Sequence, residues 1–365
     1  MAVSCVPESD QASRLPAGLS IRWDPRNRRL VMIFSWCERM PHIMTTTKPA
    51  GIELPRWRGF QPLETRLKQA RDALYSRGGI SERLVAPAEI EKMFSRLPTY
   101  DPTRGYHQLK PALASLDTEI ARQHGERASI EVGLGMLLHL AEAHEAQWSM
   151  AGLDPELKPD FVDAFHRILD AIERGGSGAM RLNSDNFTKE LAIGMSRLIP
   201  AGGQLIDPGS GVPRSLMLRR PIASIPGRVS YMLRACGGFR PFAEFHTHQR
   251  MRHLFTSDGW EYCFRRLPAV FRSRPQLKGV LGGSWFFDPK LASISPNLDF
   301  VREVSLRWGG VLIRDGVDPA ATGGALSMSE HRRQLHAQGR YQPVSYFMVA
   351  SKARILQQAR SLGLG

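Results

Sequence analysis

Residues 242–287 read FAEFHTHQRMRHLFTSDGWEYCFRRLPAVFRSRPQLKGVLGGSWFF. Within this stretch, residues 242–248 are typical of a β-strand and residues 259–271 of an amphipathic helix. Residues 279–287 form an apolar run with three glycines, which is typical of a buried strand. The stretch therefore predicts a strand–helix–strand unit within a domain that combines a sheet with covering helices.

Further elements are predicted on both sides of this unit. Downstream, residues 295–308 are expected to form a helix, and residues 311–314 and 344–350 to form the closing strands. Upstream, residues 228–236 are predicted to be a strand, and residues 197–207 a β-like run. The predicted fold class is therefore α/β (α+β), with a mixed sheet in the C-terminal half.

The N-terminal half has a different spacing of apolar residues. Apolar side chains recur at helical spacing in residues 62–77, 129–148 and 159–172. In the second of these segments, Ile130, Leu134 and their neighbours form one apolar face. We therefore expect a helical bundle or cap to precede the sheet.

The apolar periodicity and the glycine content divide the chain into three predicted regions. Residues 1–43 match neither periodicity well and are expected to be a disordered extension, or to lie before a true start at Met44. Residues 44–178 form the helical region, and the glycine-rich residues 175–178 are a plausible linker. Residues 179–365 form the α/β domain that carries the candidate site.

Charge and composition narrow the partners and the location. The 365 residues carry a formal charge of +14, which favours polyanionic partners such as nucleic acid, a phosphate-rich cofactor or an anionic surface. No nucleic-acid-binding motif is recognisable, so such binding stays possible without support from a motif. No apolar run approaches the ~20 residues that a bilayer span needs, and residues 30–34 are too short for a signal peptide. We therefore expect a cytoplasmic protein.

The order of the predicted elements resembles that of the GNAT family of acyltransferases. In that family a central strand, a helix, a second strand, a second helix and a final strand pair surround the acyl-CoA cleft. The corresponding segments here are residues 242–248, 259–271, 279–287, 295–310 and 344–350. The resemblance is one of topology over roughly half of the chain, and it implies acyl-CoA as co-substrate and (N-)acyl transfer to a small molecule.

The residues after the central strand would hold the acyl donor. GNAT enzymes carry a Gln/Arg-x-x-Gly-x-Gly/Ala loop here, whose amides at a helix N-terminus bind the CoA pyrophosphate. The equivalent residues of this chain read Gln249-Arg250-Met251-Arg252-His253 and contain no glycine. Guanidinium groups could replace the amide donors by charge. The candidate donor-binding residues are therefore Gln249, Arg250, Arg252 and, at the start of the next predicted helix, Asn297.

The predicted central strand has the highest concentration of ionisable side chains, in the sequence Glu244-Phe245-His246-Thr247-His248. Alternate side chains of a strand share one face, so Glu244, His246 and His248 are expected to project together. A histidine beside a carboxylate suits proton transfer near neutral pH. The candidate catalytic residues are therefore Glu244, His246 and His248, and we predict that Glu244 or His246 deprotonates an acceptor amine or hydroxyl.

Three alternatives remain open for this strand. The same three side chains could hold a divalent metal, with His253, Asp258 or Asp288 as further ligands, because the His-x-His spacing resembles that of amidohydrolases and cupins. The histidines could also be satisfied by hydrogen bonds within a mixed sheet. Finally, the chain could be a non-catalytic module that binds nucleic acid or another partner.

Candidate substrate-binding residues flank the second strand of the unit. Trp285 and Asp288 follow Gly282-Gly283-Ser284, where small residues allow a ligand to approach closely. Tyr346 lies in the last predicted strand and could line the same cleft. The loop-rich residues 315–339 could be a lid over an anionic ligand, or a solvated insertion.

Overall fold

The computed structural model describes residues 19–24, 29–34, 62–76, 81–99, 101, 104–219, 221–327 and 329–364. The chain divides into two compact units, Met1–Lys48 and Pro49–Gly365. In the first unit, β1 (Leu19–Asp24) pairs antiparallel with β2 (Arg29–Phe34). Most of the predicted extension, residues 1–43, lies outside the described residues.

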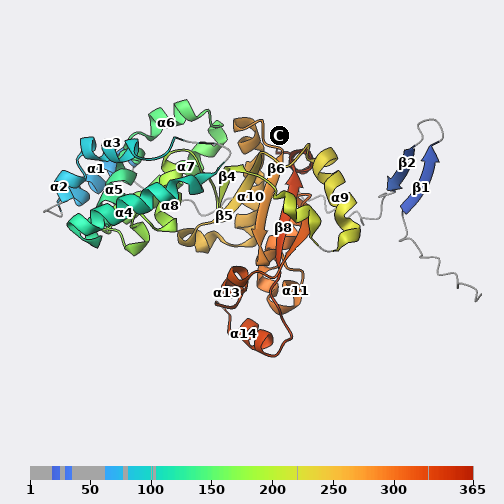
Figure 1. The fold of residues 1–365 in the computed structure, drawn as a ribbon. Helices are drawn as coiled ribbons and strands as arrows, with labels where there is room; N and C mark the ends of the chain where they lie inside the picture. The colour runs from blue at the N-terminus through green and yellow to red at the C-terminus, as the bar shows by residue number, and fades with distance from the viewer. Residues whose placement is uncertain are drawn as a thin grey trace, which may run out of the picture. The chain divides into compact units, whose positions relative to one another are not determined.

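Helices precede the sheet in the second unit, as predicted (Figure 1). The central helix of this region is α5, which is buried along most of its length and contacts α1, α4, α7 and α8. The elements are α1 (Leu63–Tyr75), α2 (Ser81–Leu84), α3 (Pro87–Ser95), η1 (Tyr106–Leu109), α4 (Lys110–His124), α5 (Glu126–Glu142), α6 (His144–Ala151), η2 (Pro155–Leu157), α7 (Lys158–Glu173), η3 (Gly178–Met180) and α8 (Asp185–Gly194).

A six-stranded sheet follows, with the strand order β3-β4-β5-β6-β8-β7. Only β5 and β6 pair in parallel; the other neighbours are antiparallel, so the sheet is mixed and the predicted α/β (α+β) class is confirmed. The strands are β3 (Ile199–Ala201), β4 (Gln204–Ser210), β5 (Phe242–Thr247), β6 (Gly279–Ser284), β7 (Val311–Gly316) and β8 (Ser345–Ser351).

Helical segments cover both faces of the sheet. The elements of this half are η4 (Arg214–Leu218), η5 (Ile222–Ser224), α9 (Ile225–Ser230), η6 (Tyr231–Ala235), η7 (Gln249–Leu254), α10 (Ser257–Ser273), η8 (Trp285–Phe287), α11 (Leu291–Ile294), η9 (Pro296–Leu298), α12 (Phe300–Arg307), α13 (Pro319–Ser327), α14 (Glu330–Ala337) and α15 (Lys352–Ser361). α10 packs against α12, where the rings of Phe264 and Trp308 stack 5.6 Å apart. One hydrophobic cluster continues from Leu74 in α1 to Ile355 in α15, so the helical region and the sheet share a core. The predicted boundary near residue 178 stays a prediction.

The expectation of a strand at residues 228–236 is wrong. This segment is helical, with α9 continuing into the π-helical turn η6. Val229, Met232 and Cys236 recur at intervals of three and four residues and pack on the sheet beside Val349 of β8. Spacing of this kind is helical, and it outweighs the β-propensity of the individual side chains.

The loop-rich residues 315–339 contain two helices, α13 and α14. Arg332 of α14 is buried: its Nε donates to the Ala325 carbonyl (2.6 Å), and its Nη1 donates to Ser295 Oγ (2.9 Å). Its guanidinium also lies 5.0 Å from the centre of the Trp285 ring. Figure 1 shows α13 and α14 beside α11 at one end of the sheet. The segment is therefore an ordered helical insertion packed on residues that follow β6.

Among the described residues, no helix combines the length and the apolar character that crossing a membrane requires.

Candidate active site

The pairing of β4 with β5 brings two carboxylates together. Asp207 of β4 lies directly opposite Glu244 of β5, so both side chains project from the same face of the sheet. His246 is two residues further along β5 and shares that face. Its Nε2 lies 3.9 Å from Glu244 Oε2 and 3.9 Å from Asp207 Oδ2. The paired strands β4 and β5 therefore place the His246 imidazole close to two carboxyl groups.

The turn η1, far away in the sequence, covers this cluster. The Tyr106 amide donates to Asp207 Oδ2 (3.0 Å), and the Tyr106 ring meets the His246 ring edge-on with centroids 5.1 Å apart. The His107 ring lies 5.6 Å from that of His246. Gly105 has φ +66°, and a Cβ there would come within 2.5 Å of Asp207 Oδ2. Glycine is therefore required for η1 to approach the carboxylate.

The two carboxylates have different partners. Ser210 Oγ donates to Glu244 Oε2 (2.6 Å), and a bulge between Asp207 and Ser210 makes this contact possible. Asp207 Oδ1 accepts from the Gly209 amide (2.8 Å). By contrast, His246 Nε2 is buried and has no hydrogen-bond partner among the described residues. This nitrogen is therefore the position in the cluster at which an imidazole without a proton can still accept one.

Burial sets the protonation of the cluster. It raises the pKa of Glu244, although the Ser210 hydrogen bond opposes the shift, and it also raises the pKa of Asp207. Burial, together with the neighbouring His107 and Lys189, lowers the pKa of His246 to about 3. At neutral pH His246 is therefore an unprotonated base, with carboxyl groups placed to stabilise the imidazolium once it accepts a proton.

The low pKa of His246 predicts acid sensitivity. The unfolded chain binds a proton at His246 near pH 6.5, whereas the folded chain does so only near pH 3. Stability should therefore fall as the pH drops through this window, by up to about 1.4 kcal/mol per pH unit for this group. Urea unfolding between pH 7 and about pH 5 should show a shallower loss in His246→Asn than in the wild type. Equal slopes in the two proteins would contradict this assignment.

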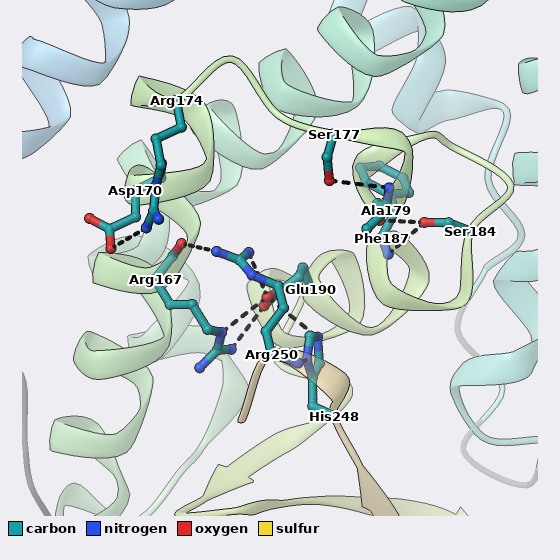
Figure 2. Close-up of polar contacts among 10 residues, drawn as sticks. All are labelled: Arg167, Asp170, Arg174, Ser177, Ala179, Ser184, Phe187, Glu190, His248 and Arg250. Carbon is teal, nitrogen blue, oxygen red and sulfur yellow. Dashed lines mark hydrogen bonds and ion pairs between the residues drawn. The ribbon is translucent and has the colours of Figure 1, made fainter. Parts of the chain in front are cut away.

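His248 does not join the cluster as expected. β5 ends at Thr247, and His248 is the N-cap of η7, where its Nδ1 accepts from the Arg250 amide (3.1 Å). The ring is fully buried, and its Nε2 lies 3.4 Å from Glu190 Oε1 (Figure 2). The chain turns out of the sheet before the third alternate position, so His248 faces α8.

Glu190 is the centre of a second buried network, shown in Figure 2. Arg167 of α7 binds it through Nε (3.0 Å) and Nη2 (2.9 Å), and Arg250 Nη1 lies 3.2 Å from its Oε1. Arg250 also donates to the Arg167 carbonyl (2.8 Å). Burial alone would raise the pKa of Glu190, but these cations lower it to about 2. The network ties η7 to the helical region.

The predicted donor-binding residues have unequal exposure. Gln249 and Arg252 of η7 and Asn297 of η9 are exposed, whereas the Arg250 guanidinium is committed to Glu190. Arg250 also lines a cavity of about 300 Å³, together with Arg174, Gly176, Ser177, Ala171, Ala179 and Met180.

Immediately after η7, Thr256 caps α10 by accepting from the Gly259 amide (3.1 Å). A Cβ on Gly259 would lie 1.9 Å from the Leu254 carbonyl oxygen, so this close turn requires glycine.

The parallel pair β5–β6 opens beside the acid–base cluster. Its register contains only two pairs, Ala243 with Val280 and Glu244 with Leu281. β5 continues to Thr247, and β6 continues to Ser284 while paired with β8 on its other side. In the described part of the chain, no strand pairs with β5 on this side beyond Glu244. The two backbones therefore diverge at the residue that carries the carboxylate.

The predicted substrate-binding residues lie at the end of β6 and on β8. Trp285 is buried and stacks on Phe286 (4.1 Å between centroids). Asp288 is buried and accepts from the amides of Lys290 (3.0 Å) and Val344 (3.4 Å), so it holds the turn after β6. Tyr346 is half-buried and pairs with Ser284 across the sheet. Their role in binding stays a prediction.

Sequence reasoning missed Asp207, Ser210, Tyr106 and His107. A signal existed for Asp207, because an acidic residue ends an otherwise apolar run, Leu205-Ile206, just before Pro208. No comparable pattern marks Tyr106 or His107, which reach the site only through tertiary packing.

No metal cluster is evident in the part of the chain that the structure describes: no group of three or more His, Cys, Asp and Glu side chains is arranged to hold an ion.

Comparisons with known proteins give one structural likeness. No family model matches the chain, and no curated protein matches its sequence. A solved structure described as that of an acyltransferase in complex with decanoyl-CoA and teicoplanin matches with a TM-score of 0.40 and 13% identity. The match covers 82% of this chain and 90% of that chain. At this score and identity, the likeness carries no argument about function.

Proposed function

We propose that this chain is an acyl-CoA-dependent acyltransferase with a GNAT-like C-terminal half. Supporting this proposal, β5, α10, β6, α12 and the β7–β8 pair follow one another in the order that the resemblance implies. The site that supports it is the cluster of Asp207, Glu244 and His246, because those side chains can accept and hold a proton.

The divergence of β5 from β6 is the observation that carries the proposal. A strand edge without a partner offers amide donors and carbonyl acceptors at regular spacing, and an extended ligand with amide groups can pair with it. The pantetheine arm of CoA is such a ligand, because it carries two secondary amides and ends in the thioester. Bound along β5, it would bring the thioester to the fork beside Glu244 and His246.

The proposed reaction needs one base and no redox partner. The acceptor nitrogen or oxygen attacks the thioester carbonyl carbon, a C–N or C–O bond forms, and the C–S bond breaks. The acceptor proton passes to His246 Nε2, or to Glu244, and then to the departing CoA thiolate. The carboxyl groups of Asp207 and Glu244 lie 3.9 Å from Nε2 and face the imidazolium that forms there.

Donor binding is proposed for the exposed end of η7. Arg252 and Gln249 are exposed next to the N-terminus of α10, where amide groups and the helix dipole favour an anion. Arg250 supports the same loop through Glu190, and Asn297 is proposed to contact the donor from η9. Arg252 is therefore expected to contribute more charge to the donor phosphates than Arg250.

The test combines ligand-dependent stability with turnover. Acyl-CoAs of several chain lengths should raise the melting temperature of the full-length protein, because they bind the folded state only. Arg252→Ala should weaken that shift about 10-fold in ligand concentration, whereas Arg122→Ala, an exposed arginine on α4, should leave it unchanged. Release of free CoA thiol with amine or hydroxyl acceptors should follow. Absence of any acyl-CoA shift would refute the proposal.

The alternatives have less support. The metal hypothesis needs Glu244, His246 and His248 together, but His248 pairs with Glu190 instead. A melting-temperature shift with divalent metals, lost on chelation, would favour it over acyl transfer. Salt-sensitive binding to nucleic acid or to another partner, without any response to acyl-CoA, would favour the non-catalytic alternative.

A further inference from the structure

The segment between Asp207 and Glu244 has an unusual charge pattern. Its residues include six arginines, at positions 214, 219, 220, 228, 234 and 240, and no Asp, Glu or Lys. In the structure, Arg214, Arg219 and Arg234 are exposed, and Arg219 Nε lies 3.0 Å from Asp315 Oδ1. Because the segment carries arginines and no acidic residue, its surface is positively charged.

Large apolar side chains are exposed on the same segment. Leu218 is 70% exposed, Ile222 is 70% exposed and Leu233 is 57% exposed. η5, α9 and η6 form one continuous helical run, and Ile222 and Leu233 are about three helical turns apart in it, so they lie on a similar side. Val311, on the edge strand β7 that contacts η4, is also exposed (40%). Exposed apolar groups that gather in this way mark an interaction surface.

Buried contacts and hydrogen bonds anchor this segment to the rest of the protein. Met232 of η6 and Cys236, which caps it, are buried against the sheet. Arg228 donates to the carbonyls of Arg219 (2.6 Å) and Pro221 (3.0 Å), and so connects the helix to η4. The leucines and the isoleucine therefore project outward from an anchored segment.

We propose that residues 214–234 dock the protein on an anionic membrane surface. A helix with aliphatic side chains on one side and arginines around them inserts its apolar groups about 5–10 Å into the headgroup region, while the cations meet anionic lipids. Nucleic acid would use the arginines but leave the aliphatic groups exposed. A protein interface would favour aromatic anchors, whereas Leu218, Ile222 and Leu233 are all aliphatic.

The test is co-sedimentation of the full-length protein with vesicles. Vesicles that contain phosphatidylglycerol should bind at least about 10-fold more protein than vesicles of phosphatidylcholine alone, and added salt should weaken the binding. The triple variant Leu218→Ser, Ile222→Ser, Leu233→Ser should bind about 10-fold less. Met150→Ser is the matched control, because Met150 is 79% exposed on α6. Unchanged melting temperatures would establish that each variant is folded.

A second measurement separates insertion from simple charge attraction. In Leu233→Trp, the added tryptophan fluorescence should shift to shorter wavelength on anionic vesicles. The proposal is overturned if the wild type ignores anionic vesicles, if the triple variant binds as well as the control, or if the Leu233→Trp emission does not move. It is also overturned if the triple serine variant abolishes self-association or nucleic-acid binding and leaves vesicle binding intact.

Discussion

His246→Asn should lower kcat for acyl transfer by about 10²-fold or more, because a positioned general base contributes on the order of 10²–10⁴ to such a reaction. The placement of His246 motivates this prediction, since its Nε2 is buried without a hydrogen-bond partner among the described residues and lies 3.9 Å from each of two carboxyl groups. The measurement is the rate of thiol release from acyl-CoA at saturating donor. KM for acyl-CoA should change little, because donor contacts are proposed for η7 and the edge of β5.

Glu244→Gln is the companion variant. The amide keeps the shape of the side chain and can still bond to Ser210, but it cannot hold a proton or stabilise an imidazolium. We expect kcat to fall by about 10²-fold here as well. Glu119→Gln, at an exposed carboxylate on α4, is the control and should keep full activity. If both His246→Asn and Glu244→Gln retain more than half of the wild-type kcat, the base lies elsewhere.

Glu190→Ala should destabilise the protein by about 3–5 kcal/mol, the usual cost of leaving a buried charge without its partner. Glu190 is completely buried, and its removal leaves the guanidinium groups of Arg167 and Arg250 without their shared carboxylate. Chemical denaturation of the wild type and the variant measures this difference. Because Arg250 belongs to η7, the variant should also respond more weakly to acyl-CoA.

An exposed ion pair is the control for this second prediction. Arg96 and Glu119 form a bridge at 2.5 Å, with side chains that are 46% and 40% exposed. Glu119→Ala should leave the free energy of unfolding nearly unchanged, because water screens such pairs. If Glu190→Ala were equally mild, water or a rearranged side chain would have to replace Glu190 in the network, and its proposed role in holding η7 would be wrong.

The local spacing of apolar and polar residues was sufficient to predict the strand–helix–strand unit around the candidate site. The alternation of Glu244 and His246 with apolar residues predicted a strand with one polar face, and the structure has that strand as β5. The helix and the buried strand that follow were also predicted, as α10 and β6. Residues 228–236 were misassigned because Val229 and Tyr231 favour strands as individual residues, whereas the helical spacing of the apolar side chains decided the outcome.

The sequence by itself determined the strand–helix–strand unit, the placement of Glu244 and His246 on one face, and the charge pattern of residues 214–240, because each depends on neighbours only a few positions apart. Tertiary structure alone decided that Asp207 and the turn at Tyr106 complete the cluster and that His248 pairs with Glu190. Such contacts join positions that are far apart along the chain. They depend on strand register and on which faces are buried together, and no local pattern encodes either.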